Sequence, residues 1–193
     1  PAGRVDWWPA WAALGVLAIM LPEGATGQIA GWRARFDPYH LTIPPHITVM
    51  YPPFVSQSEW QVERTALAQR LAGFPVFDVI LARTGAFLAP RHVLWLQPED
   101  GGMTRLLEAT VREHFGLPPA PPPYEFTSHV TIGFFDDEAA LRQAEAEVMA
   151  TLTPIVFRVT AATYLFGRED GTWQVADPLS FDQAGPLSGE VVP

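Results

Sequence analysis

The sequence contains no cysteine, which excludes disulfide bonds and thiolate metal sites. It is also poor in positive charge, because twelve basic residues stand against 21 acidic ones and give a net charge of −9. A charge of this sign opposes the binding of a long polyanion such as duplex DNA. It leaves room for a small phosphate ligand, or for an RNA end held in a locally favourable cleft. The absence of cysteine fits a reducing cytoplasm, which is the location that we expect.

Charged residues are missing from one apolar segment, between Asp6 and Glu23. The segment is shorter than the roughly 20 apolar residues that a membrane span needs, and no clear cleavage site follows it. We therefore interpret residues 14–21, LGVLAIML, as a buried first strand that ends at Pro22, and we expect no membrane association.

The length of 193 residues, with 48% hydrophobic and 17% charged residues, is typical of a folded globular chain. We expect a single domain over residues 1–193. Its core should span about residues 14–181, and the tail at 183–193 should be loose.

Local patterns predict an alternation of helices and strands. Helices are indicated by apolar spacing, by the Ser56/Glu59 capping box and by Asp136-Asp137, and strands by β-branched and aromatic runs between Pro and Gly. The predicted helices cover about residues 25–36, 57–72, 103–115 and 138–152. The predicted strands cover about residues 14–21, 46–51, 74–90, 92–98, 129–134, 155–166 and 173–181.

One six-residue phrase occurs twice, as HITVMY at residues 46–51 and as HVTIGF at residues 129–134. Both copies have the pattern His, β-branched aliphatic, Thr, β-branched aliphatic, any residue, aromatic. Each copy is a predicted strand with a predicted helix before and after it. The sequence therefore predicts an internal duplication that forms two similar α+β lobes.

Alternation along a strand places the polar residues of each phrase on one face. His46 and Thr48 share a face in the first copy, and His129 and Thr131 share one in the second. If the two polar faces converge on one cleft, the site holds two imidazoles and two hydroxyls. Two histidines can act as general base and general acid in displacement at phosphorus, while hydroxyls bind the phosphate oxygens.

The aromatic residue at the end of each phrase falls on the apolar face. We therefore expect Tyr51 and Phe134 to pack in the core, unless a β-bulge turns them toward the cleft. In that case they become candidates for substrate binding. Metal binding by His46 and His129 is a weaker alternative than acid–base catalysis, because no third candidate ligand lies at a spacing typical of a metal site.

The stretches PPHITVMYPPF and YEFTSHVTIGFF resemble the two H-x-T-h motifs (h, hydrophobic) of the two-histidine (2H) phosphoesterase superfamily. Within it, the chain is most similar to the 2′-5′ RNA ligase family and its RNA 2′,3′-cyclic phosphodiesterases. The resemblance spans roughly residues 14–181. It implies a bilobal α+β fold, with two antiparallel-rich sheets and outer helices around a central cleft, and chemistry without a metal or cofactor.

Carried over residue by residue, the resemblance makes His46 and His129 the acid–base pair and Thr48 and Thr131 the phosphate ligands. Cyclic phosphodiesterases of this kind often carry a basic residue at the sixth position of the second motif, where this chain has Phe134. Arg91, just before the VLWL strand, is the nearest candidate to replace it.

Two kinds of function remain in competition. The first is a phosphodiesterase acting on 2′,3′-cyclic or 2′-5′-linked nucleotides or RNA ends. The second is a binding module for a nucleotide or RNA end that does not turn over its ligand. Ligation of RNA 2′-5′ ends is a further possibility, ranked below hydrolysis. We expect a monomer in each case, and neither the substrate nor the histidine that acts as base follows from the sequence.

Overall fold

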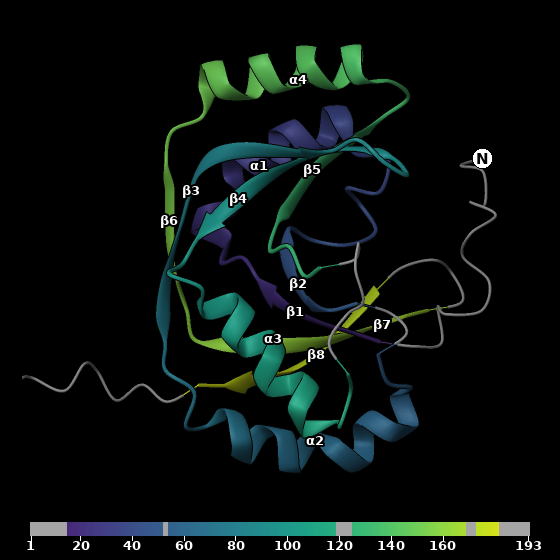
Figure 1. Cartoon of the computed structure of the whole chain (residues 1–193), viewed down its shortest axis with the longest axis vertical. Coiled ribbons are helices and arrows are strands. Elements are labelled where there is room, and N and C mark those ends of the chain that lie inside the picture. Colours follow the sequence, from purple (N-terminus) through teal and green to yellow (C-terminus); the bar gives the residue numbers. More distant parts are fainter. Residues whose placement is uncertain (1–14, 52–53, 119–124, 169–172, 182–193) are drawn as a thin grey trace, which may run out of the picture.

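The computed structural model describes residues 15–51, 54–118, 125–168 and 173–181 (Figure 1). Within these ranges the elements are, in chain order, β1 (Val16–Met20), α1 (Glu23–Phe36), β2 (His46–Met50), α2 (Gln57–Leu71), β3 (Phe77–Phe87), β4 (His92–Glu99), α3 (Met103–His114), β5 (Val130–Phe135), α4 (Glu138–Thr151), β6 (Ile155–Val159), β7 (Ala161–Gly167) and β8 (Trp173–Ser180). The order of strands and helices is the one that the sequence predicted, except that two strands, β6 and β7, replace the one predicted over residues 155–166.

The strands form two four-stranded sheets, with the orders β2-β1-β7-β8 and β5-β4-β3-β6. All neighbouring strands in both sheets are antiparallel. The α+β class with two antiparallel sheets and outer helices is therefore confirmed. The strands that carry the two copies of the repeated phrase, β2 and β5, each lie at one edge of a sheet.

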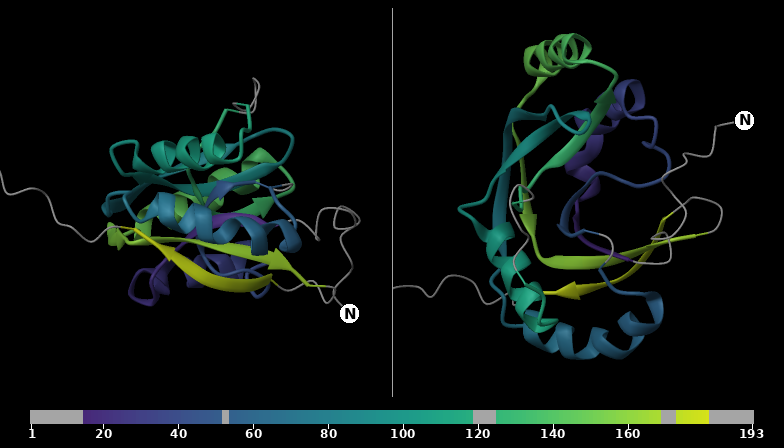
Figure 2. Two further views of the ribbon diagram at one scale, coloured as in Figure 1. Left: turned by 90° about the horizontal axis from the view of Figure 1, so that it is seen from below. Right: turned by 45° about the vertical axis from the view of Figure 1, so that its right-hand side comes forward.

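Two of the helices each precede the motif strand of one sheet and pack against the motif strand of the other sheet. Helix α1 leads into β2 but packs against β5, and helix α3 leads toward β5 but packs against β2. Figures 1 and 2 show α4 and α2 at the two ends of the long axis, where α4 covers β4 and β5 and α2 contacts β8. One hydrophobic cluster joins side chains of both sheets, including Leu17, Ile47, Leu94 and Ile132.

The predicted helix starts are confirmed at two positions. Ser56 and Glu59 form a reciprocal capping box at α2, and the Asp137 carboxylate accepts a hydrogen bond from the Ala140 amide at the start of α4. These bonds satisfy amide groups that have no partner inside the first helical turn. They fix where the chain turns into the helix after each motif strand.

The prediction of one strand over residues 155–166 is wrong. The chain leaves the second sheet after Val159 and enters the first sheet at Ala161, so β6 pairs with β3 while β7 pairs with β1 and β8. At the break, the Thr160 carbonyl accepts a hydrogen bond from the Phe181 amide. The β propensity is continuous over these residues, and propensity does not indicate which sheet a residue joins. The change of partner strand could therefore not be predicted from it. The predicted loose tail at 183–193 lies outside the described residues.

Candidate functional site

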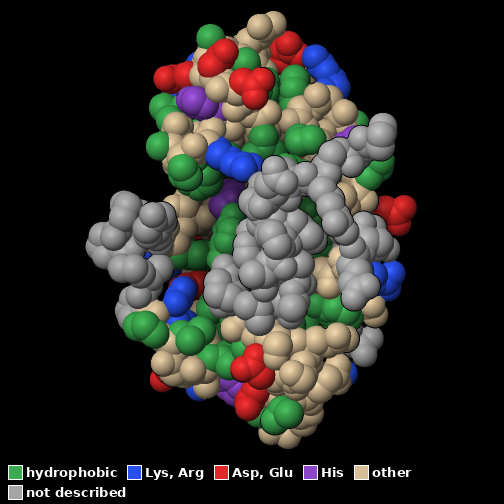
Figure 3. Space-filling model, turned by 90° about the vertical axis from the view of Figure 1, so that its right-hand side faces the viewer, with side chains coloured by type: hydrophobic (Ala, Val, Ile, Leu, Met, Phe, Trp, Pro, Cys, Tyr) green, Lys and Arg blue, Asp and Glu red, His purple; other side chains and the backbone are tan. Residues whose placement is uncertain are grey.

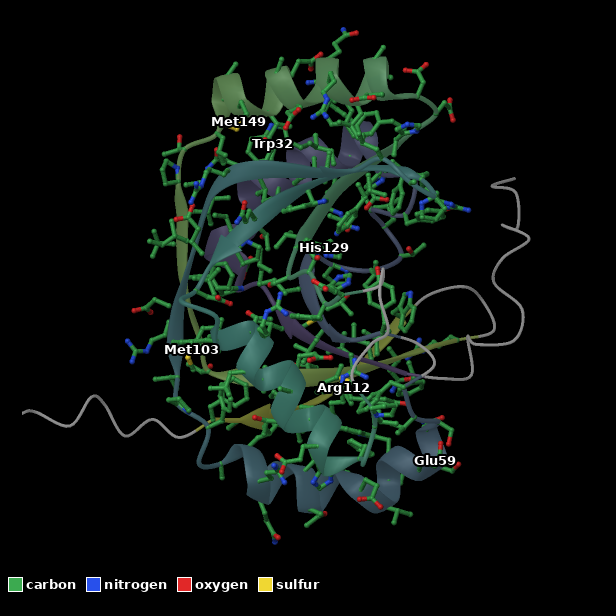
Figure 4. All side chains as sticks on the ribbon, viewed as in Figure 1. Trp32, Glu59, Met103, Arg112, His129 and Met149 are labelled. Carbon is green, nitrogen blue, oxygen red and sulfur yellow. The ribbon has the colours of Figure 1, made fainter. Side chains whose placement is uncertain are left out.

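The two motif strands lie next to each other, because the edge strands β2 and β5 of the two sheets are in contact. A cleft with a cavity volume of about 180 Å³ lies at this junction, and both histidines and both threonines line it. His46 is the first residue of β2, and His129 directly precedes β5. Figure 4 shows His129 near the middle of the molecule, away from the outer helices α2 and α4. The structure thus brings together His46, Thr48, His129 and Thr131.

Each of the two imidazoles makes a hydrogen bond of the same kind, between its Nδ1 and a backbone carbonyl oxygen. Nδ1 of His46 lies 2.9 Å from the carbonyl oxygen of Pro44, and Nδ1 of His129 lies 2.8 Å from that of Thr127. Since a carbonyl oxygen only accepts, Nδ1 carries the proton and donates in both cases. In each neutral imidazole the lone pair is therefore on Nε2, the nitrogen that can exchange a proton with a ligand.

The surroundings lower the pKa of both histidines. Burial is the main cause and lowers the pKa of His46 from 6.5 to about 4, against the opposing effect of its bond to Pro44. The positive charge of Arg33 lowers the pKa of His46 further. Burial also lowers the pKa of His129, while the bond to Thr127 opposes this shift. Both imidazoles are therefore predominantly neutral at pH 7 in the free protein.

Each motif strand contains a β-bulge at the same position. Opposite β1, Val49 is the extra residue between Thr48 and Met50. Opposite β4, Ile132 is the extra residue between Thr131 and Gly133. Since a bulge shifts the alternation by one residue, the sixth position of each phrase returns to the side of the His and Thr.

The bulges correct the expectation for the two terminal aromatic residues. Tyr51 is 66% exposed and Phe134 is partly buried, and both line the cleft instead of packing in the core. The ring of Phe134 packs edge-on against Tyr39, with centroids 5.6 Å apart. Trp173 also lines the cleft, so aromatic rings form a large part of its wall. The alternative that a bulge turns these residues toward the cleft is the one that the structure supports.

Arg91 is not among the described residues that line the cleft. It is exposed and directly precedes β4. Arg33, from the last turn of α1, lines the cleft instead and is only 4% exposed. It forms an ion pair with Asp37, which also lines the cleft.

Sequence reasoning missed Arg33 for a physical reason. An Arg and an Asp four residues apart at the end of a helix usually form a solvent-exposed pair. The pair is buried here because α1 packs across β5 of the other sheet, a contact that the local sequence does not reveal.

Figure 3 shows the face of the molecule that carries a recess, with histidine atoms visible in it. Within the described ranges, no group of three or more His, Asp or Glu side chains is placed to hold a metal ion. The same ranges contain no helix long and apolar enough to cross a bilayer.

Two antiparallel sheets whose adjacent edge strands each present a His and a Thr to one cleft define the two-histidine phosphoesterase class. Residues 21–171 match the family model described as the 2′-5′ RNA ligase superfamily. The chain belongs to this superfamily.

Two similar bacterial proteins carry names that agree with membership of this superfamily. A protein of Geobacillus thermodenitrificans named "Putative phosphoesterase" is 26% identical over 162 residues, which cover 82% of this chain and 91% of the relative. A "Putative phosphoesterase" of Bacillus cereus strain G9842 is 30% identical over 151 residues, which cover 75% of this chain and 83% of the relative. Among solved structures, apo LigT of E. coli is 26% identical with a TM-score of 0.57, over 89% of this chain and 98% of LigT.

Proposed function

We propose that the protein is a metal-independent phosphodiesterase that acts on 2′,3′-cyclic phosphates or 2′-5′-linked nucleotides, with His46 and His129 as its acid–base pair. The observation that carries this proposal is the matched geometry of the two imidazoles. Each imidazole donates from Nδ1 to the carbonyl two residues earlier, which leaves the lone pair on Nε2, and both histidines line the same cleft. Displacement at phosphorus needs one base and one acid, and two imidazoles in one cleft can fill these two roles.

For a 2′,3′-cyclic phosphate, the reaction is an in-line attack of water on phosphorus. One imidazole removes a proton from the water as its oxygen bonds to phosphorus. The other, protonated imidazole gives its proton to the ribose oxygen as the bond from that oxygen to phosphorus breaks. The product is a phosphomonoester, and proton exchange with solvent restores the two histidines. Because both are neutral in the free protein, the anionic substrate has to raise the pKa of the one that serves as acid.

Thr48 and Thr131 supply the hydroxyl groups on the same strands. Both are half-buried and line the cleft beside the histidines. Their hydroxyls can donate to the non-bridging phosphate oxygens, where negative charge builds up during the attack. Tyr51, Phe134 and Trp173 offer rings against which a flat nucleobase can stack.

Relatives support a phosphate-bearing ligand. LigT of E. coli has been solved in complex with phosphate and in complex with ATP, and both structures are 25% identical to this chain, with TM-scores of 0.56 and 0.58. The net charge of −9 favours a small nucleotide or a short RNA end over a long nucleic acid in this chain.

The test is hydrolysis of a panel of nucleoside 2′,3′-cyclic phosphates and 2′-5′ dinucleotides in the presence of EDTA. We expect turnover by the wild type and a loss of roughly 100-fold or more in His46→Ala and in His129→Ala, since general acid–base catalysis contributes about 10²–10⁴. His92→Ala is the matched control, because His92 lies at the start of β4 and is not among the described residues of the cleft. Full activity in either cleft variant overturns the mechanism.

Two observations favour a second function, binding without turnover. Phe134 stands where the cyclic phosphodiesterases that this chain resembles often carry a basic residue, and both imidazoles are neutral in the free protein. Tight nucleotide binding with no product over several hours would support this reading. Ligation of 2′-5′ ends is the reverse of cleavage and ranks below hydrolysis, because water is in excess.

A further inference from the structure

We propose that Arg33 is the cation that grips the substrate's phosphate, in the role that Phe134 leaves open, with Asp37 holding its guanidinium in place. The inference rests on the proposed function, since it assigns a phosphate ligand to the same cleft. Arg33 comes from α1, a helix outside both motif strands, and it lines the cleft together with His46 and His129.

The guanidinium of Arg33 is fixed by three hydrogen bonds. Nε and Nη2 donate to Oδ2 of Asp37 at 2.8 and 2.6 Å, and Nη1 donates to the carbonyl of Ile43 at 2.9 Å. These bonds use three of the five N–H groups of an arginine. Among the described residues, Asp37 and Ile43 are the acceptors for this guanidinium, which leaves one N–H group on each terminal nitrogen for a ligand. Donors on the two terminal nitrogens of an arginine can bind two oxygens of one phosphate.

Asp37 is itself immobilised. Its second oxygen, Oδ1, accepts a hydrogen bond of 2.8 Å from the Tyr39 amide. The side chains of Arg33 and Asp37 are only 4% and 2% exposed. A buried and fully oriented guanidinium loses little further freedom when it binds an anion, which is what a ligand-binding cation requires.

Arg33 also connects the two copies of the repeated phrase. On one side, the end of α1 touches β5 so closely that a Cβ added at Gly133 would lie 2.7 Å from the carbonyl oxygen of Phe36. On the other side, Arg33 holds the Ile43 carbonyl, next to the Pro44 carbonyl that orients His46. The position of Arg33 therefore depends on the contact of α1 with β5 and on the segment that leads into β2.

Arg33 is also the cation that the cleft itself contains. All twelve basic residues of the chain are arginines, and Arg33 is the one arginine among the described residues that line the cleft. Its charge is balanced by Asp37. The pair therefore adds no net charge to the cleft, and Arg33 binds a phosphate through directed N–H donors more than through excess positive charge.

The experiment compares Asp37→Asn with the double variant Arg33→Met/Asp37→Asn, so that only the guanidinium differs. Binding of inorganic phosphate is measured by calorimetry, and hydrolysis of adenosine 2′,3′-cyclic phosphate is measured alongside. In the single variant an amide oxygen can still accept from the guanidinium and hold it in place. This variant should therefore bind phosphate at least as tightly as the wild type, because the positive charge is no longer balanced. The double variant should bind it tenfold or more weakly. Equal dissociation constants in the two folded variants, within threefold, overturn the proposal.

The matched control is Arg35→Met, two residues along the same helix, where the side chain is 60% exposed and pairs with Glu147. It should leave phosphate binding unchanged. Should the double variant fail to fold, Arg33→Lys keeps the charge but loses the fork. It should raise KM for the cyclic phosphate three- to tenfold with a smaller change in kcat, and wild-type KM in this variant overturns the proposal. If the wild type hydrolyses no substrate, the proposed function fails, while the phosphate titrations still decide the role of Arg33.

Discussion

The first and second copies of the phrase are alike in what the local chain makes and unlike in what other elements add. Both have the Nδ1–carbonyl bond, a threonine beside the histidine and a bulge after it. Around His46 lies the Arg33–Asp37 pair from the end of α1, whereas His129 packs against Phe87, with ring centroids 5.1 Å apart. The repeated motif thus supplies equivalent side chains and hydrogen bonds, while the neighbouring elements make the surroundings of the two histidines different.

The threonines test whether the two copies contribute equally. Thr48→Val and Thr131→Val keep the β-branched shape and remove only the hydroxyl. Each should lower kcat/KM by about 10²–10³, the cost of losing one donor to a developing oxyanion. The melting temperature should change little. Steady-state kinetics with a cyclic nucleotide decide the matter, and a large effect at one position with none at the other shows that the copies have diverged in function.

The pH dependence of stability tests the difference between the two histidines. A pKa lowered by folding means that the unfolded chain binds the proton more readily, so stability is full above pH 6.5 and falls as the pH drops toward the folded value of about 4 for His46. Protonation of His46 should lower the free energy of unfolding by on the order of 3 kcal/mol over this pH range, since one pKa unit corresponds to about 1.4 kcal/mol.

His46→Gln should therefore flatten the loss of stability between pH 7 and pH 4, and His129→Gln should do so less, because Arg33 adds to the effect of burial at His46 alone. Chemical denaturation at several pH values measures this. A profile for His46→Gln that parallels the wild type contradicts the assigned burial of the imidazole.

Gly133 has no counterpart in the first copy, where the same position is Met50. A Cβ at Gly133 would lie 2.4 Å from the Cβ of Phe36, so Gly133→Ala forces α1 away from β5. We expect a loss of about 1–3 kcal/mol of stability, typical of overpacking, and weaker phosphate binding because Arg33 moves with α1. Thermal and denaturant unfolding measure the first effect and calorimetry the second.

Gly31→Ala is the matched control on the same helix, because nothing lies within 4 Å of a Cβ added there. It should raise stability by about 0.5–1 kcal/mol, the usual gain of Ala over Gly inside a helix. Similar effects of the two substitutions would mean that α1 does not depend on its contact with Gly133.

Much of the fold and half of the site could be predicted from the sequence. The order of strands and helices follows from hydrophobic spacing and from caps such as Ser56, and the convergence of His46 and His129 follows from the repeated phrase. The bulges at Val49 and Ile132 could not be predicted, because they arise in the pairing with β1 and β4. The burial of Arg33 could not be predicted either, because it depends on α1 crossing to the other sheet.

The smallest predicted effect on stability is that of Tyr51, which occupies the same position in the first copy as Phe134 does in the second. Tyr51 is 66% exposed, so Tyr51→Ala should change the free energy of unfolding by less than about 0.5 kcal/mol, as surface substitutions usually do. Phe134 packs on Tyr39, and Phe134→Ala should cost about 1 kcal/mol or more. If Tyr51 stacks on the base of the substrate, Tyr51→Ala raises KM for a nucleoside 2′,3′-cyclic phosphate severalfold while leaving KM unchanged for a cyclic phosphate that lacks a base. An equal change of KM for both substrates would show that Tyr51 acts on the phosphate end of the cleft and not on the base.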